Sequence, residues 1–86
     1  MAPPPLDVSV IVPAYMAETF IARALNSIAG QSAAPREVIV VDDGSTDGTA
    51  AAAEACRDVL GAVDLKIFRQ DNLGAGAARN RAVREA

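Results

Sequence analysis

The sequence predicts an α/β fold, a three-layer βαβαβα unit built on three parallel strands. Apolar runs of strand length lie at 8–12 and 38–41, and apolar residues alternate with polar ones at 63–67. A segment with helical periodicity follows each of these runs. Strands that alternate with helices are joined by right-handed crossovers, so we expect one three-stranded parallel sheet, in the order 3-2-1, with helices on both faces.

The first strand and the first helix are expected within residues 8–30. The apolar run of the strand ends at Pro13, which lacks the backbone N–H that a strand residue donates. The helix ends before Gly30, which can serve as its C-terminal cap. One face of this helix is apolar, and its residues are Phe20, Ile21, Ala24, Leu25 and Ile28.

The second strand ends in two adjacent acids, Asp42 and Asp43. The carboxyl ends of parallel strands are the side on which open α/β sheets bind ligands. Successive side chains of a strand point to opposite faces of the sheet. We therefore expect one of the two carboxylates to face a ligand and the other to serve the turn or the flanking helix.

The second helix follows a tight turn that Gly44 permits. Ser45, Thr46 or Asp47 can cap this helix, because short polar side chains accept hydrogen bonds from its first N–H groups. Gly61 is expected to stop the helix. Its apolar face consists of Ala52, Ala53, Cys56, Val59 and Leu60.

The third strand and the third helix complete the unit. In the strand, Val63, Leu65 and Ile67 alternate with polar residues. The helical pattern then runs to the last residue without a glycine, asparagine or proline stop signal. Its apolar face consists of Ala75, Ala78, Ala82, Val83 and Ala86. The first strand would keep a bare apolar edge, so we expect a fragment of a longer protein that can self-associate through this edge.

Composition excludes several classes of protein. The 86 residues fit one small domain, expected at 7–86 after a disordered leader at 1–6. A net charge of −3 argues against nucleic acid as a partner, and one cysteine without histidine leaves no zinc site. No apolar run approaches the about 20 residues that cross a bilayer. We expect a cytoplasmic protein, with any membrane association supplied by parts outside this chain.

Three segments together resemble the N-terminal half of the family 2 glycosyltransferases, which have the GT-A fold. These segments are VSVIVPAY at 8–15, EVIVVDDGSTDGT at 37–49 and DNLGAGAARN at 71–80. The resemblance implies an inverting transferase that moves a sugar from a nucleotide-sugar donor, commonly a UDP-sugar, to an acceptor hydroxyl. This chain would supply the nucleoside-binding half and would be inactive alone.

The resemblance also implies which residues contact the donor nucleotide. Asp43 matches the acid that accepts a hydrogen bond from the uracil ring N–H, and Tyr15 is placed to stack on a base. The guanidinium of Arg79 suits a uracil carbonyl or a phosphate. The five implied contacts are Pro13, Tyr15, Asp43, Asn72 and Arg79, and the further candidates are Ala14, Glu18 and Asp42.

Structural alternatives stay open for several of these residues. Tyr15 can be a packed ring, and Arg79 can belong to a solvated helix face. Glu18 can be a first-turn glutamate that the helix dipole favours. Met16 stands where the family commonly has asparagine, which removes an amide that could order the loop.

The residues that carry out the chemistry are expected outside this chain. In the resembled family, an Asp-x-Asp pair after the next strand holds a divalent metal, Mg or Mn, on the donor diphosphate. A later acid is the base that activates the acceptor. We therefore expect no catalytic residue and no metal ligand within these 86 residues.

Two other classes compete with this interpretation. A dinucleotide-binding module of an oxidoreductase would have its glycine fingerprint after the first strand, where this chain has Pro-Ala-Tyr-Met at 13–16. A phosphoacceptor signalling domain shares only the acidic pair. The donor sugar and the acceptor are not specified by these residues.

Overall fold

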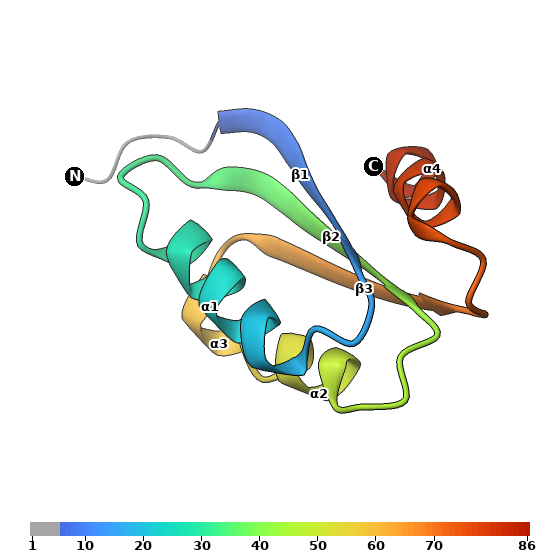
Figure 1. The fold of residues 1–86 in the computed structure, drawn as a ribbon. Coiled ribbons are helices and arrows are strands. Elements are labelled where there is room, and N and C mark those ends of the chain that lie inside the picture. Colours follow the sequence, from blue (N-terminus) through green and yellow to red (C-terminus); the bar gives the residue numbers. More distant parts are fainter. Residues whose placement is uncertain (1–5) are drawn as a thin grey trace.

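The computed structural model describes residues 6–86 and confirms the predicted α/β fold (Figure 1). The strands are parallel and pair in the order β1-β2-β3, the predicted 3-2-1 arrangement. The elements are β1 (Leu6–Ala14), α1 (Glu18–Ala29), β2 (Pro35–Asp43), α2 (Thr49–Glu54), α3 (Arg57–Leu60), β3 (Asp64–Gln70) and α4 (Ala75–Glu85).

The central strand β2 carries the core on both of its faces. Val38 and Val40 pack with residues of α1, α2 and α3, whereas Ile39 and Val41 pack with α4 on the other side of the sheet (Figure 1). All four side chains are fully buried. The alternation continues into the two acids that end the strand, so these acids face opposite sides of the sheet.

The strand β1 is longer than predicted at both ends. Leu6 is its first residue, although the sequence placed this residue in the leader; residues 1–5 of that leader lie outside the described residues. The strand also continues through Pro13 to Ala14 and stays in register with β2. Proline is tolerated there because β1 pairs on one side only in the described sheet.

The predicted second helix is in fact two short helices, α2 and α3. The regular hydrogen-bond ladder breaks at Cys56, whose N–H bonds to the carbonyl oxygen of Ala53 at 3.0 Å, three residues back. Cys56 and Leu60 are buried as predicted, whereas Val59, predicted on the same face, is exposed. Gly61 ends α3 with a φ of 59°, which confirms the predicted stop.

The buried faces of α1 and α4 are narrower than predicted. On α1 the buried residues are Ile21 and Leu25, and on α4 they are Ala78 and Ala82. A sheet of three strands covers only a narrow stripe of each helix, so other predicted apolar positions remain exposed. These are Phe20, Ala24, Ala75, Val83 and Ala86. Within residues 6–86, every helix is too short or too polar to cross a bilayer.

Candidate functional site

A pocket of about 260 Å³ lies at the carboxyl ends of β1 and β2, beside the first turn of α4. This is the end of the sheet where the sequence places a ligand. The walls are mostly apolar, with one carboxylate and one side-chain amide. The lining residues are Pro13, Ala14, Tyr15, Asp43, Asn72, Gly74, Ala75 and Ala78.

Five of the residues predicted from the sequence meet in this pocket. They come from three separate segments of the chain and are Pro13, Ala14, Tyr15, Asp43 and Asn72. Tyr15 stands at the rim, because 54% of its surface remains exposed. An exposed ring beside a hollow can stack on a planar ligand. The role of these residues as nucleotide contacts stays a prediction.

The carboxylate of Asp43 is buried and holds the loop between β3 and α4. Its Oδ1 accepts hydrogen bonds from the Gln70 amide and the Leu73 N–H, and its Oδ2 accepts one from the Gly74 N–H, each at 2.9 Å. Foremost among them, the Gln70 hydrogen bond holds the pKa of Asp43 below its ordinary value, although burial acts the other way. Since a carboxylate has about four acceptor sites, Oδ2 can accept one more donor from the pocket.

The turn after Asp43 packs directly against the same loop. Gly44 has a φ of 77°, and a Cβ built on it would lie 2.8 Å from the backbone nitrogen of Asn72. Only glycine allows this approach without displacing the backbone. The sequence predicted the tight turn. The structure shows a second need for glycine there, because the turn packs against the backbone of Asn72.

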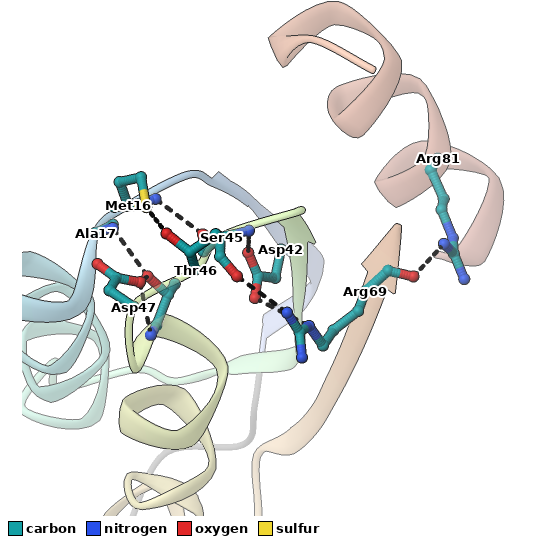
Figure 2. Close-up of polar contacts among 9 residues, drawn as sticks. Met16, Ala17, Asp42, Ser45, Thr46, Asp47, Arg69 and Arg81 are labelled. Atoms are coloured by element: carbon teal, nitrogen blue, oxygen red, sulfur yellow. Dashed lines mark hydrogen bonds and ion pairs between the residues drawn. The ribbon is translucent and has the colours of Figure 1, made fainter. Parts of the chain in front are cut away.

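The carboxylate of Asp42 faces the other side of the sheet. Its Oδ1 accepts the Ser45 N–H at 3.0 Å, and its Oδ2 lies 3.3 Å from Nε of Arg69, the residue opposite on β3 (Figure 2). Arg69 also donates from Nη2 to the carbonyl oxygen of Ser45 at 3.0 Å. Of the two acids, Asp42 therefore serves the turn and Asp43 faces the pocket, a division that follows the strand alternation.

Two other predicted contacts lie outside the pocket lining. Arg79 is exposed on α4, one residue beyond Ala78, and so points about 100° around the helix from it. Glu18 is exposed in the first turn of α1, where its carboxylate lies against Gly48. The dipole of α1 accounts for a glutamate at this position.

Three residues of the pocket lining were not predicted from the sequence, namely Gly74, Ala75 and Ala78. Gly74 has a φ of 101° and directs its N–H at Asp43, while Ala75 and Ala78 keep the pocket open because their side chains are small. The glycine two residues after Asn72 is the sequence signal that could have located this wall.

The described residues do not fit a divalent metal. Between residues 6 and 86, no three acidic, cysteine or histidine side chains lie close enough together to hold an ion. Asp42 and Asp43 face opposite sides of the sheet, and each is already engaged by protein donors. The adjacent acids are therefore not a metal pair.

Comparison with known proteins identifies the family. The profile described as Glycosyl transferase family 2 matches residues 9–86. The chain belongs to glycosyl transferase family 2. This match spans the three segments that carry the predicted resemblance. It gives no support to the alternative of a dinucleotide-binding module from an oxidoreductase.

Two relatives illustrate the family likeness. The succinoglycan biosynthesis protein ExoU of Rhizobium meliloti is 43% identical over 79 residues, which are 92% of this chain and 22% of ExoU. The poly(ribitol-phosphate) beta-N-acetylglucosaminyltransferase TarS of Staphylococcus aureus is 42% identical over 82 residues, covering 91% of this chain and 14% of TarS. The family 2 chain described here thus spans about a fifth or less of these relatives.

A solved structure confirms the predicted GT-A fold. The crystal structure of S. aureus TarS superposes with a TM-score of 0.80 at 40% identity, over 94% of this chain and 15% of the TarS chain. At this identity the likeness extends to the sequence as well as to the fold.

Proposed function

We propose that this chain is the nucleoside-binding part of a glycosyltransferase that uses a nucleotide-sugar donor, with UDP as the nucleotide. The observation that carries the proposal is the pocket at the strand ends, in which the Asp43 carboxylate lies between apolar walls beside the exposed Tyr15 ring. Membership of family 2 supports the reaction class.

The volume of the pocket suits one part of the donor, such as the base, better than the whole donor. Its volume of about 260 Å³ is smaller than the about 300–1,000 Å³ of pockets that hold whole ligands. We expect the base to enter beside Tyr15, with the ribose and the diphosphate extending outward. In this pose, the remaining acceptor site on Asp43 Oδ2 meets the ring N–H of uracil. Cytosine has no hydrogen at that position, so Asp43 favours uridine over cytidine nucleotides.

The finer parts of the proposal concern the whole protein. Transfer with inversion, to an acceptor hydroxyl, is what the family resemblance implies. Asp43 is the one carboxylate that lines the described pocket, and it is engaged by three donors. Residues 6–86 therefore offer no free base there, and we expect no sugar transfer by them alone. The metal ligands of the family would be acids outside these residues.

Calorimetry with the 86-residue chain tests the nucleoside site. We expect UDP to bind about tenfold or more tightly than CDP. Asp43→Asn should remove this preference, because an amide offers a donor as well as an acceptor. Gln70→Ala is the matched control, since it deletes one hydrogen bond to Asp43 but keeps the carboxylate. Equal affinity of the wild-type chain for UDP and CDP would refute the proposal.

Two remaining predictions concern the cellular location and the self-association of the protein. Cell fractionation tests the expected cytoplasmic location. A concentration series in light scattering tests self-association through β1, which pairs only with β2 in the described sheet.

A further inference from the structure

The turn that follows β2 binds the start of α1 through three side chains. Three consecutive backbone N–H groups each donate to a different side chain, 29 to 32 residues away along the chain. The pairs are Met16 N to Ser45 Oγ (2.8 Å), Ala17 N to Thr49 Oγ1 (2.9 Å) and Glu18 N to Asp47 Oδ2 (3.3 Å). We call Ser45, Asp47 and Thr49 the clamp residues.

The clamp residues bind the backbone at the N-terminal side of α1, which has no side-chain cap of its own. The first N–H groups of a helix have no partner within the helix and are usually bound by its own N-cap side chain. The N-cap of α1 is Ala17, which has no side-chain acceptor. The sequence predicted Ser45 as a cap of the following helix, but its hydroxyl instead binds the N–H of Met16, in the turn between β1 and α1 (Figure 2).

The clamp residues are themselves fixed. The side chain of Asp47 accepts hydrogen bonds from the Thr49 N–H at 3.0 Å and from the Thr49 hydroxyl, so it also binds the first N–H of α2. That hydroxyl can therefore present its lone pair to Ala17. Ser45 and Thr49 are both buried. The Thr49 hydroxyl is therefore held in one orientation, and it holds the turn that it binds in one position.

The clamped turn directly continues one wall of the pocket. Tyr15 stands at the pocket rim, and the next residue, Met16, has a left-handed φ of 51°. A residue with a Cβ rarely adopts this conformation unless its surroundings enforce it. Here the Ser45 hydroxyl binds the Met16 N–H, and the Thr46 hydroxyl contacts the Met16 sulfur at 3.5 Å. The hydrogen bond to Ser45 therefore holds the peptide that joins Tyr15 to Met16.

We propose that Ser45, Asp47 and Thr49 are positioning residues for the pocket. They hold the β1–α1 turn so that the Tyr15 ring forms the rim, and through it they set the affinity for a nucleoside diphosphate. The affinity part rests on the proposed function, whereas the placement of Tyr15 does not. The segment 42–49 thus contributes to the site in two ways. Asp43 lines the pocket, and the clamp residues hold the turn next to Tyr15.

The fluorescence of Tyr15 gives a direct readout, because the chain has one tyrosine and no tryptophan. Thr49→Val keeps the side-chain volume but deletes the hydroxyl, and Thr49→Ser restores it. We expect Thr49→Val and Ser45→Ala to change acrylamide quenching of Tyr15 and to raise the Kd for UDP about three- to tenfold, the weight of one hydrogen bond. Thr49→Ser should stay near wild type.

Ser9→Ala is the control for the loss of a hydrogen-bonded hydroxyl, here a half-buried one. Ser9 donates to Glu37 at 2.8 Å, near the opposite end of the sheet, so its loss should lower stability without changing quenching or affinity. Far-UV circular dichroism confirms folding of every variant. If Thr49→Val does not fold, Ser45→Ala decides the outcome.

Three results separate the clamp from the proposed function. Altered quenching and weaker UDP binding in folded variants, with rescue by Thr49→Ser, support the clamp. Unchanged quenching and affinity in folded Ser45→Ala and Thr49→Val overturn it, even when wild type binds UDP. If wild type does not bind UDP, the proposed function fails, and the quenching data alone decide whether the clamp residues position Tyr15.

Discussion

Replacing Gly44 by alanine should destabilise the protein and distort the pocket by more than the positive φ of this residue alone would cause. A Cβ at this position would lie 2.8 Å from Asn72 N and 3.2 Å from Asn72 Cα, whereas ordinary contact begins at 3.4 Å. Both neighbours are backbone atoms, so either the turn or the loop must move by about 0.6 Å. Asn72 lines the pocket, and the next two residues donate to Asp43.

Gly61→Ala provides a matched control for this substitution. Gly61 also has a positive φ, of 59°, but a Cβ there would meet nothing within 4 Å. Both variants carry a cost of about 1–3 kcal/mol, because a residue with a Cβ rarely adopts a positive φ. Gly44→Ala adds overpacking of about 1–3 kcal/mol. We therefore expect Gly44→Ala to lower the free energy of unfolding by about 2–6 kcal/mol and Gly61→Ala by about 1–3 kcal/mol.

Urea denaturation followed by circular dichroism measures the difference between these two variants. Calorimetry with UDP then shows whether the moved loop affects the pocket. We expect Gly61→Ala to keep the wild-type Kd and Gly44→Ala to lose most of the affinity. Equal destabilisation of the two variants, or unchanged affinity in a folded Gly44→Ala, would contradict the close approach described here.

Three further changes test other parts of the structure. Leu25→Ala empties a fully buried site on α1 and should cost about 2–5 kcal/mol in urea denaturation; a loss below 1 kcal/mol argues against this core. Hydrogen bonds lower the pKa of Asp43 in the folded protein. The ionised carboxylate therefore stabilises the fold at pH values above its unfolded pKa, and this contribution is lost as the pH falls through the folded pKa. The urea concentration at the unfolding midpoint should therefore decrease as the pH is lowered below about 4, and it should decrease less steeply in Asp43→Asn. Equal pH dependence of the two midpoints would contradict this. Ala75→Leu should fill the pocket and weaken UDP binding while thermal stability stays unchanged.

The strands and their order could be predicted because local signals agree with the tertiary structure. The apolar run of β2 is buried on both faces, as a central parallel strand requires. The break between α2 and α3 could not be predicted, since periodicity places Val59 on the same face as Cys56. Exposure of Phe20 and Val83 depends on how far the sheet extends beside each helix, which periodicity along one helix does not contain.

The candidate site was predicted as a set of positions but not as a set of contacts. Pro13, Tyr15, Asp43 and Asn72 meet because each lies at or just after the carboxyl end of a strand of the same parallel sheet. The donors that bind Asp43 come from residues 70–74, about 30 positions later, and no local pattern pairs them. The same holds for the clamp residues, of which Ser45 and Asp47 were predicted as caps of the following helix and Thr49 was not predicted.

Strand geometry gives the two adjacent acids different tasks, and the cross-strand neighbours on β3 enforce them. Asp42 lies opposite Arg69 and Asp43 opposite Gln70. The charged partner holds Asp42 to the turn, whereas the neutral amide donates one hydrogen bond to Asp43 and adds no positive charge beside the pocket. A cation at position 70 would compete with a ligand donor for the Asp43 carboxylate. A neutral residue at this position therefore leaves an acceptor site of Asp43 available for a donor group of a ligand in the pocket.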